Sequence, residues 1–103
     1  MLILQRSPGE QIRIGDSIIL TLDHVYKNRR QAEVTVHYAD TNEDVEHLLN
    51  LHEMVRIALR VEICLTKSST MASWIGIDAP LEITILRAEV EPRDINRKEE
   101  DKC

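Results

Sequence analysis

Hydrophobic and polar residues alternate with a period of two along most of this chain, which is the pattern of strands that bury one face. The strand-like runs cover residues 2–5, 11–14, 32–38, 74–77 and 82–86, together with a β-rich run at 18–22. Turn-forming residues separate them, most plainly in Ser7-Pro8-Gly9-Glu10, because proline presets one backbone dihedral and glycine tolerates positive φ. The pattern predicts a mainly β protein that begins with two short strands, within residues 1–16, folded onto each other.

Residues 41–54 break the alternation and predict an amphipathic helix. Thr41 is a suitable N-cap, and the acidic residues after it suit the first turn of a helix. The residues with the spacing of one helical face are Val45, Leu48, Leu49 and His52. Residues 40–54 hold five acidic and no basic residues, which equals the net charge of the whole chain, −5. We therefore expect an acidic helix that either only covers the sheet or also docks a basic partner.

After the expected helix, the alternation returns. Residues 55–65 predict one long strand, and two closing strands are expected on either side of a turn at Asp78-Ala79-Pro80. A short helix is permitted mainly after Pro92, and residues 97–103 predict a polar tail. A chain of 103 residues predicts a single domain.

The composition narrows the class of protein. Two tyrosines, one tryptophan and no phenylalanine leave the core to Ile, Leu and Val, and dimerisation would enlarge such a core. No apolar run approaches membrane-spanning length, and the two cysteines give little support for a disulfide. We therefore expect a cytoplasmic protein without membrane contact. No residue pattern typical of a catalytic centre or a metal site stands out, so we expect neither an enzyme nor a metal or cofactor.

Two groups of short motifs carry a resemblance to a known family. The first group is Met1-Leu2-Ile3-Leu4, Arg6, Gly9-Glu10 and Ile14-Gly15-Asp16. The second runs from Ile75-Gly76-Ile77-Asp78-Ala79-Pro80 through Ile83, Ile85, Arg87 and Glu89. In this order they resemble the opening and closing segments of the CsrA/RsmE family of carbon storage regulators, bacterial RNA-binding regulators of translation. The resemblance covers about half of the chain.

The resemblance implies an interleaved β dimer, in which the first strand of one subunit pairs with the last strand of the other. It also implies that a GGA element, in an mRNA leader or a small regulatory RNA, lies across this strand pair. The RNA-binding residues carried over from the family are Leu4, Gln5, Arg6, Ala79, Pro80, Ile83, Ile85 and Arg87. Arg87 is the strongest candidate, since a guanidinium group offers several donors to phosphates and base edges.

The middle of the chain is longer than in the usual family members. We expect a CsrA-like core of residues 1–16 and 61–91, with about 17–60 as an insertion that adds a hairpin and the helix. An internal partial duplication is the alternative, because Val55-Arg56-Ile57 is similar to Ile12-Arg13-Ile14, and residues 61–65 are similar to 18–22.

The leading hypothesis for function is a homodimeric regulator that binds GGA-containing mRNA leaders or small RNAs and controls translation and mRNA stability. Ser7 and Trp74 stand where the family commonly has basic residues, which bears on the affinity for RNA. Trp74 either packs or stacks on a base. The alternative function is a CsrA-like protein-interaction module or antagonist that acts through the acidic helix, with weak or no RNA binding.

Overall fold

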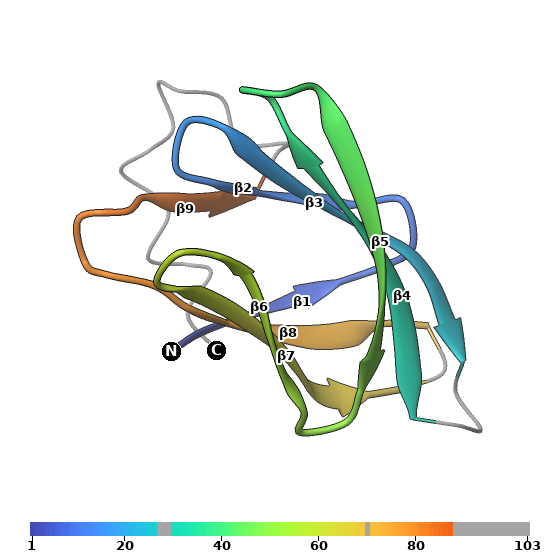
Figure 1. Ribbon diagram of the computed structural model, residues 1–103. Coiled ribbons are helices and arrows are strands. Elements are labelled where there is room, and N and C mark those ends of the chain that lie inside the picture. The colour runs from blue at the N-terminus through green and yellow to red at the C-terminus, as the bar shows by residue number, and fades with distance from the viewer. Residues whose placement is uncertain (27–29, 70, 88–103) are drawn as a thin grey trace.

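The computed structural model describes residues 1–26, 30–69 and 71–87, and in this part of the chain nine strands form two antiparallel sheets (Figure 1). The strands are β1 (Leu2–Arg6), β2 (Gln11–Ile14), β3 (Ile18–Tyr26), β4 (Gln31–Tyr38), β5 (Glu43–Asn50), β6 (Met54–Ala58), β7 (Val61–Ser68), β8 (Ser73–Asp78) and β9 (Ile85–Arg87). Sheet A has the order β1-β8-β7-β6, and sheet B has the order β5-β4-β3-β2-β9. The described residues contain no helix, so the prediction of a mainly β protein is confirmed.

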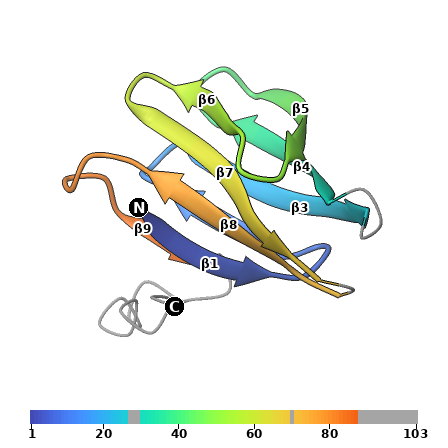
Figure 2. The same cartoon turned by 90° about the horizontal axis from the view of Figure 1, so that it is seen from below.

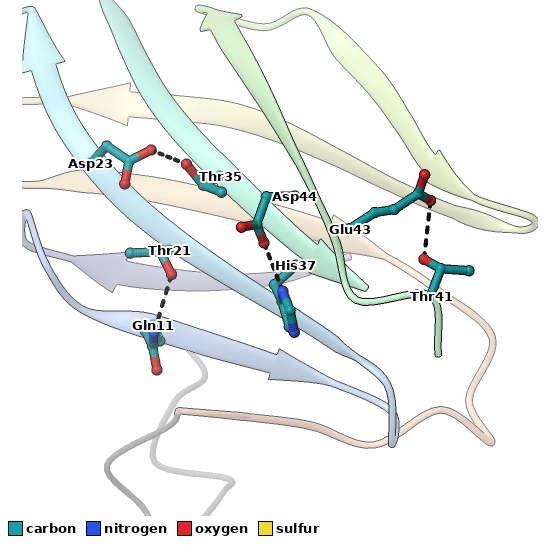
Figure 3. A network of polar contacts seen from close by, with 8 residues as sticks. All are labelled: Gln11, Thr21, Asp23, Thr35, His37, Thr41, Glu43 and Asp44. Carbon is teal, nitrogen blue, oxygen red and sulfur yellow. Dashed lines mark hydrogen bonds and ion pairs between the residues drawn. The ribbon is translucent and has the colours of Figure 1, made fainter. Parts of the chain in front are cut away.

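The two sheets lie in layers over a core of aliphatic side chains (Figure 2). In sheet A, Leu4 of β1 lies opposite Ile75 of β8, which lies opposite Leu65 of β7, and all three are buried. The outer face of sheet B is polar instead (Figure 3): the Gln11 side-chain amide donates to the Thr21 hydroxyl at 3.2 Å. The alternation in the sequence therefore corresponds to alternating burial.

The helix predicted for residues 41–54 is wrong, because most of these residues form strand β5 at the edge of sheet B. Leu49 lies opposite Ala32 of β4 and is fully buried. The Thr41 hydroxyl caps no helix but donates to the Glu43 carboxylate at 3.0 Å (Figure 3). Asn42 has a φ of 57°, the left-handed conformation of a turn residue. Pairing with β4 and burial on the core face outweigh the local preference for a helix.

One further prediction about strands is wrong. Residues 55–65 do not form one strand, because the chain reverses between β6 and β7, where Arg60 has a φ of 69°. Within one chain β1 pairs with β8 and β9 pairs with β2, and pairing of the first strand with the last strand of a second subunit stays a prediction. The predicted C-terminal helix and polar tail lie outside the described residues.

The two halves of the chain repeat one arrangement with an offset of 43 residues. Strand β2 begins at residue 11 and β6 at residue 54, while β3 begins at residue 18 and β7 at residue 61. Both β3 and β7 contain a register shift at the matching place, directly after Leu22 and Leu65. The repeat therefore extends to irregular features of the strands.

The turns that precede β2 and β6, residues 7–10 and 50–53, also match. In each turn the N–H of the fourth residue donates to the carbonyl of the first, at 3.0 and 3.1 Å. The third residue has positive φ, 92° for Gly9 and 67° for His52. Its N–H donates to the carbonyl at the register shift of β3 or β7, at 2.7 and 2.8 Å.

The first strand of each repeat lies in the sheet of the other repeat. Strand β1 precedes β2, β3 and β4 along the chain but pairs with β8 in sheet A (Figure 1). Strand β5 precedes β6, β7 and β8 but pairs with β4 in sheet B. The registers agree, since Leu2 lies opposite Ile77, and Val45, 43 residues after Leu2, lies opposite Val36. An insertion would not reproduce these registers, so the structure favours the partial duplication.

The common turn geometry predicts opposite effects of Gly9→Ala and His52→Gly on stability. Gly9→Ala should lower the free energy of unfolding by about 1–2 kcal/mol, because an L residue is strained at positive φ. No atom lies within 4 Å of the added Cβ, so this cost comes from the backbone alone. His52→Gly should raise the free energy of unfolding by roughly 0.5–1 kcal/mol, because it removes such strain. Urea unfolding measures both, and a destabilised His52→Gly variant would contradict the matching turns.

Candidate functional site

An open, mainly apolar groove lies between the start of β1 and the chain that connects β8 to β9. The residues that line it are Met1, Leu2, Ile77, Ala79, Pro80, Leu81, Ile83, Thr84 and Ile85. Four of them, Ala79, Pro80, Ile83 and Ile85, were predicted as site residues. We call this feature the β1–β9 groove.

Two backbone hydrogen bonds shape the connection that forms one wall of the β1–β9 groove. The Ile83 N–H donates to the Pro80 carbonyl at 3.0 Å, which closes a turn. The Gly15 N–H donates to the Thr84 carbonyl at 2.7 Å, which ties the connection to the end of β2. Gly15 has a φ of 63°, a conformation that glycine adopts without strain. These two hydrogen bonds therefore fix the backbone of this wall on the N-terminal side of β9.

The register between β9 and β2 determines which way the side chains of β9 face. Ile85 lies opposite Ile14, and Arg87 lies opposite Ile12. Ile12 and Ile14 are buried in the core, and opposed residues of neighbouring strands share one face. Ile85 and Arg87 are therefore on the face of β9 that is turned toward sheet A. Arg87 is half-buried there.

The other predicted arginine, Arg6, is buried, with 4% of its surface exposed. Its Nε donates to the Gln5 carbonyl at 2.7 Å, and its Nη1 donates to the Gln11 carbonyl at 3.2 Å. Nε also lies 3.8 Å from the Glu10 carboxylate. These contacts hold the end of β1 against the start of β2, so Arg6 supports the backbone of the site.

The remaining predicted residues on β1, Leu4 and Gln5, face opposite ways. Leu4 is 1% exposed and packs in the core, so only its backbone is near the strand edge. Gln5 is exposed on the outer face of sheet A, opposite Trp74. The Lys67 Nζ lies 4.8 Å from the centroid of the Trp74 ring on the same face. Trp74 and Gln5 therefore belong to a neighbouring surface and do not line the groove.

The fold brings the two predicted arginines to the same corner. Arg87 lies opposite Ile12, the residue after Gln11, and the Gln11 carbonyl accepts the hydrogen bond from Arg6. The corner joins the end of β1, the start of β2 and the end of β9. Arg6 and Arg87 are 81 positions apart in the chain, so only the pairing of β9 with β2 makes them neighbours.

Strand β1 offers a backbone edge along the groove. Within residues 1–26, 30–69 and 71–87, its one neighbour in the sheet is β8. An edge strand presents N–H and C=O groups that no sheet neighbour takes up. The site therefore combines an apolar groove, a backbone edge and an arginine.

Comparisons of the chain with protein-family models, with curated proteins and with solved structures found no match. Among the described residues, no group of three or more His, Cys, Asp or Glu side chains is placed to hold a metal ion. The same residues contain no helix long and apolar enough to cross a membrane. Burial raises the pKa of the Cys64 thiol, more than a backbone hydrogen bond from His52 lowers it, which favours the unreactive protonated form.

Sequence reasoning missed Met1, Leu2, Ile77, Leu81 and Thr84 as lining residues. Leu2 carried a usable indication, because it alternates in phase with Leu4 and therefore shares its face. Leu81 and Thr84 lie in a connection without regular structure, where no period relates sequence to side-chain direction.

The contacts of buried Arg6 predict that Arg6→Ala destabilises the fold by about 1–3 kcal/mol, because it deprives the Gln5 and Gln11 carbonyls of a donor. Urea unfolding measures the change. Arg13→Ala removes an exposed arginine of neighbouring β2 and serves as the control, with an expected change within about 0.5 kcal/mol. Equal stability of Arg6→Ala and the wild type would show that Arg6 does not hold β1 against β2.

Proposed function

We propose that this protein is a CsrA-like regulator that binds single-stranded GGA elements of mRNA leaders or small RNAs in the β1–β9 groove, and so controls translation and mRNA stability. The observation that carries the proposal is the groove itself. Four residues predicted from the family resemblance line it, and Arg87 is on the face of β9 that is turned toward it.

The chemistry of the groove suits unpaired RNA bases. Bases in a loop or a single strand expose their edges, and backbone N–H and C=O groups can read these edges. The free edge of β1 offers such groups, while Leu2, Ile83 and Ile85 offer apolar surface to the base faces. Arg87 supplies the donors and the positive charge for a phosphate or a guanine edge.

The acidic net charge is compatible with RNA binding because the charge is unevenly distributed. Glu43, Asp44 and Glu46 lie on β5, at the opposite edge of sheet B from β9. Asp44 also accepts from the His37 ring at 2.6 Å (Figure 3). Charges separated by more than about 10 Å are largely screened at ordinary salt concentrations, so these carboxylates weaken binding in the groove only slightly.

The pairings within one chain are compatible with the dimer expected from the family. In the described part of the chain, β1 has β8 as its one sheet neighbour and β9 has β2. The residues that line the groove all come from one chain. A homodimer and a cytoplasmic location stay predictions.

A protein-interaction module is the competing function, and it loses the helix on which it was based. The acidic residues of that expected helix lie on edge strand β5. If the RNA experiments below show no binding, protein binding becomes the favoured function.

The first test compares a hairpin RNA that carries GGA in its loop with the same hairpin carrying CCA. The protein should bind the GGA hairpin at least about tenfold more tightly, which corresponds to one or more specific base contacts. Fluorescence anisotropy at two salt concentrations measures this difference. Affinity should fall as salt rises, with a shallow slope because few cations contact phosphates. Equal affinity for both hairpins would exclude sequence-specific recognition.

The second test is Arg87→Ala, with Arg13→Ala as the matched control. Arg87→Ala should weaken binding of the GGA hairpin by about tenfold or more, since it removes a guanidinium contact. Arg13 lies opposite Leu86, on the other face of the same strand pair, so its removal takes away an equal charge outside the groove. Circular dichroism should show an intact fold for both. The same loss of affinity in both variants would indicate a nonspecific effect of charge and contradict the assigned site.

A further inference from the structure

We propose that each chain binds one RNA element only, because the internal repeat contains a counterpart of the β1–β9 groove that lacks one wall and is acidic. This inference rests on the proposed RNA binding and concerns a different surface, where β5 and β6 lie. It follows from comparing matching positions of the two repeats.

The counterpart of the groove lacks one of its walls. The offset of 43 residues matches β1 with β5 and β2 with β6. Strand β9 lies alongside β2, so its counterpart would lie alongside β6. Within residues 1–26, 30–69 and 71–87, however, the one sheet neighbour of β6 is β7. Among the described residues, the second half of the site therefore has no strand in the place of β9.

Tyr38 occupies part of this place. The matching registers of β4 and β8 make Tyr38 the counterpart of Ala79, a small residue that lines the β1–β9 groove. The Tyr38 hydroxyl donates to the Ile57 carbonyl of β6 at 2.6 Å. Ile57 corresponds to Ile14 of β2, the residue that lies opposite Ile85 of β9. One repeat thus has a strand where the other has a phenol ring.

The hydroxyl of Tyr38 remains a donor at neutral pH. Burial, and secondly the Glu43 carboxylate, raise the pKa of Tyr38 above its ordinary value. The hydrogen bond to β6 is therefore kept throughout the pH range in which RNA binding is measured.

The two surfaces also differ in charge. Asp44 and Glu46 on β5 correspond to Met1 and Ile3 at the start of the chain, and both acidic residues are exposed. Strand β1 contains no acidic residue. Carboxylates at the matching edge repel phosphates, so the surface at β5 is unsuited to RNA even where it is open.

The experiment is a titration of the wild-type protein with the GGA hairpin, in which native mass spectrometry counts the RNA molecules per chain. Light scattering gives the oligomeric state, so that the ratio is expressed per chain whether or not a dimer forms. We expect one RNA molecule per chain at saturation. Two RNA molecules per chain would overturn this inference and leave the proposed function intact. Absence of binding to the GGA hairpin would overturn both.

Matched substitutions in the two repeats provide a second measurement. Leu2→Gln should weaken RNA binding severalfold, whereas Val45→Gln at the corresponding position of β5 should leave the affinity unchanged. Val45 is 40% exposed, so the fold tolerates glutamine there. A loss of affinity in Val45→Gln equal to that in Leu2→Gln would overturn the inference. If Leu2→Gln fails to fold, Arg87→Ala takes its place and should remove binding without leaving a second site of wild-type affinity.

Tyr38→Phe tests the surface at β6 directly. It keeps the ring and removes the hydrogen bond to Ile57, so the urea midpoint should fall while the RNA ratio stays at one per chain. A second RNA molecule bound to Tyr38→Phe would overturn the inference that the absent strand excludes RNA.

Discussion

The structure depends on the exchange of first strands between its two repeats. A three-stranded unit such as β6, β7 and β8 leaves the edge of β8 open, and β1 from the other repeat closes it. The same holds for β4, which β5 closes. Because each exchanged strand also contributes a core residue, Leu4 or Leu49, neither sheet can form its core from one repeat alone. The same exchange of strands thus completes the hydrogen bonding of the sheets and buries the core.

This exchange also creates the candidate site. Strand β1 is an edge of sheet A, and β9 is an edge of sheet B, so the β1–β9 groove forms where the rims of the two layers meet. The buried contacts of Arg6 fix the end of β1 there. A mobile strand edge would lose conformational freedom on binding RNA, and a fixed edge avoids most of that loss. The exchange of strands that completes the core therefore also fixes the strand edge along the groove.

The sequence predicted the fold wherever alternation and turn residues agreed, and failed where they did not. Glycine marked the turn at Gly9, but the matching turn has His52, which gives no comparable indication. Arg60 likewise gives no indication in the sequence that the chain reverses between β6 and β7, so an alternating run was predicted as one strand. In β5 the residues have a helical spacing, and the pairing with β4, which the local pattern does not indicate, makes them a strand.

For the candidate site, alternation was more informative than the family resemblance about the direction of side chains. Arg6 is in phase with Leu2 and Leu4, which places it on the core face, and a buried charge there requires polar partners. Its partners, the Gln11 carbonyl and the Glu10 carboxylate, lie across a turn and cannot be assigned from strand period alone. Local sequence patterns also could not predict that Arg6 and Arg87 lie at the same corner, since this depends on the pairing of β9 with β2.

The two repeats differ at matching positions in what lies beside the strand edge. At Ala79 the small side chain leaves room for the β1–β9 groove, and β9 satisfies the edge of β2. At Tyr38 the side chain is large, and its hydroxyl donates to a carbonyl of β6. An unpaired strand edge needs such a partner, because exposed N–H and C=O groups invite pairing with other chains. In the described part of the chain, the edge of β2 is therefore satisfied by a strand, whereas the related carbonyl of β6 is satisfied by a side chain.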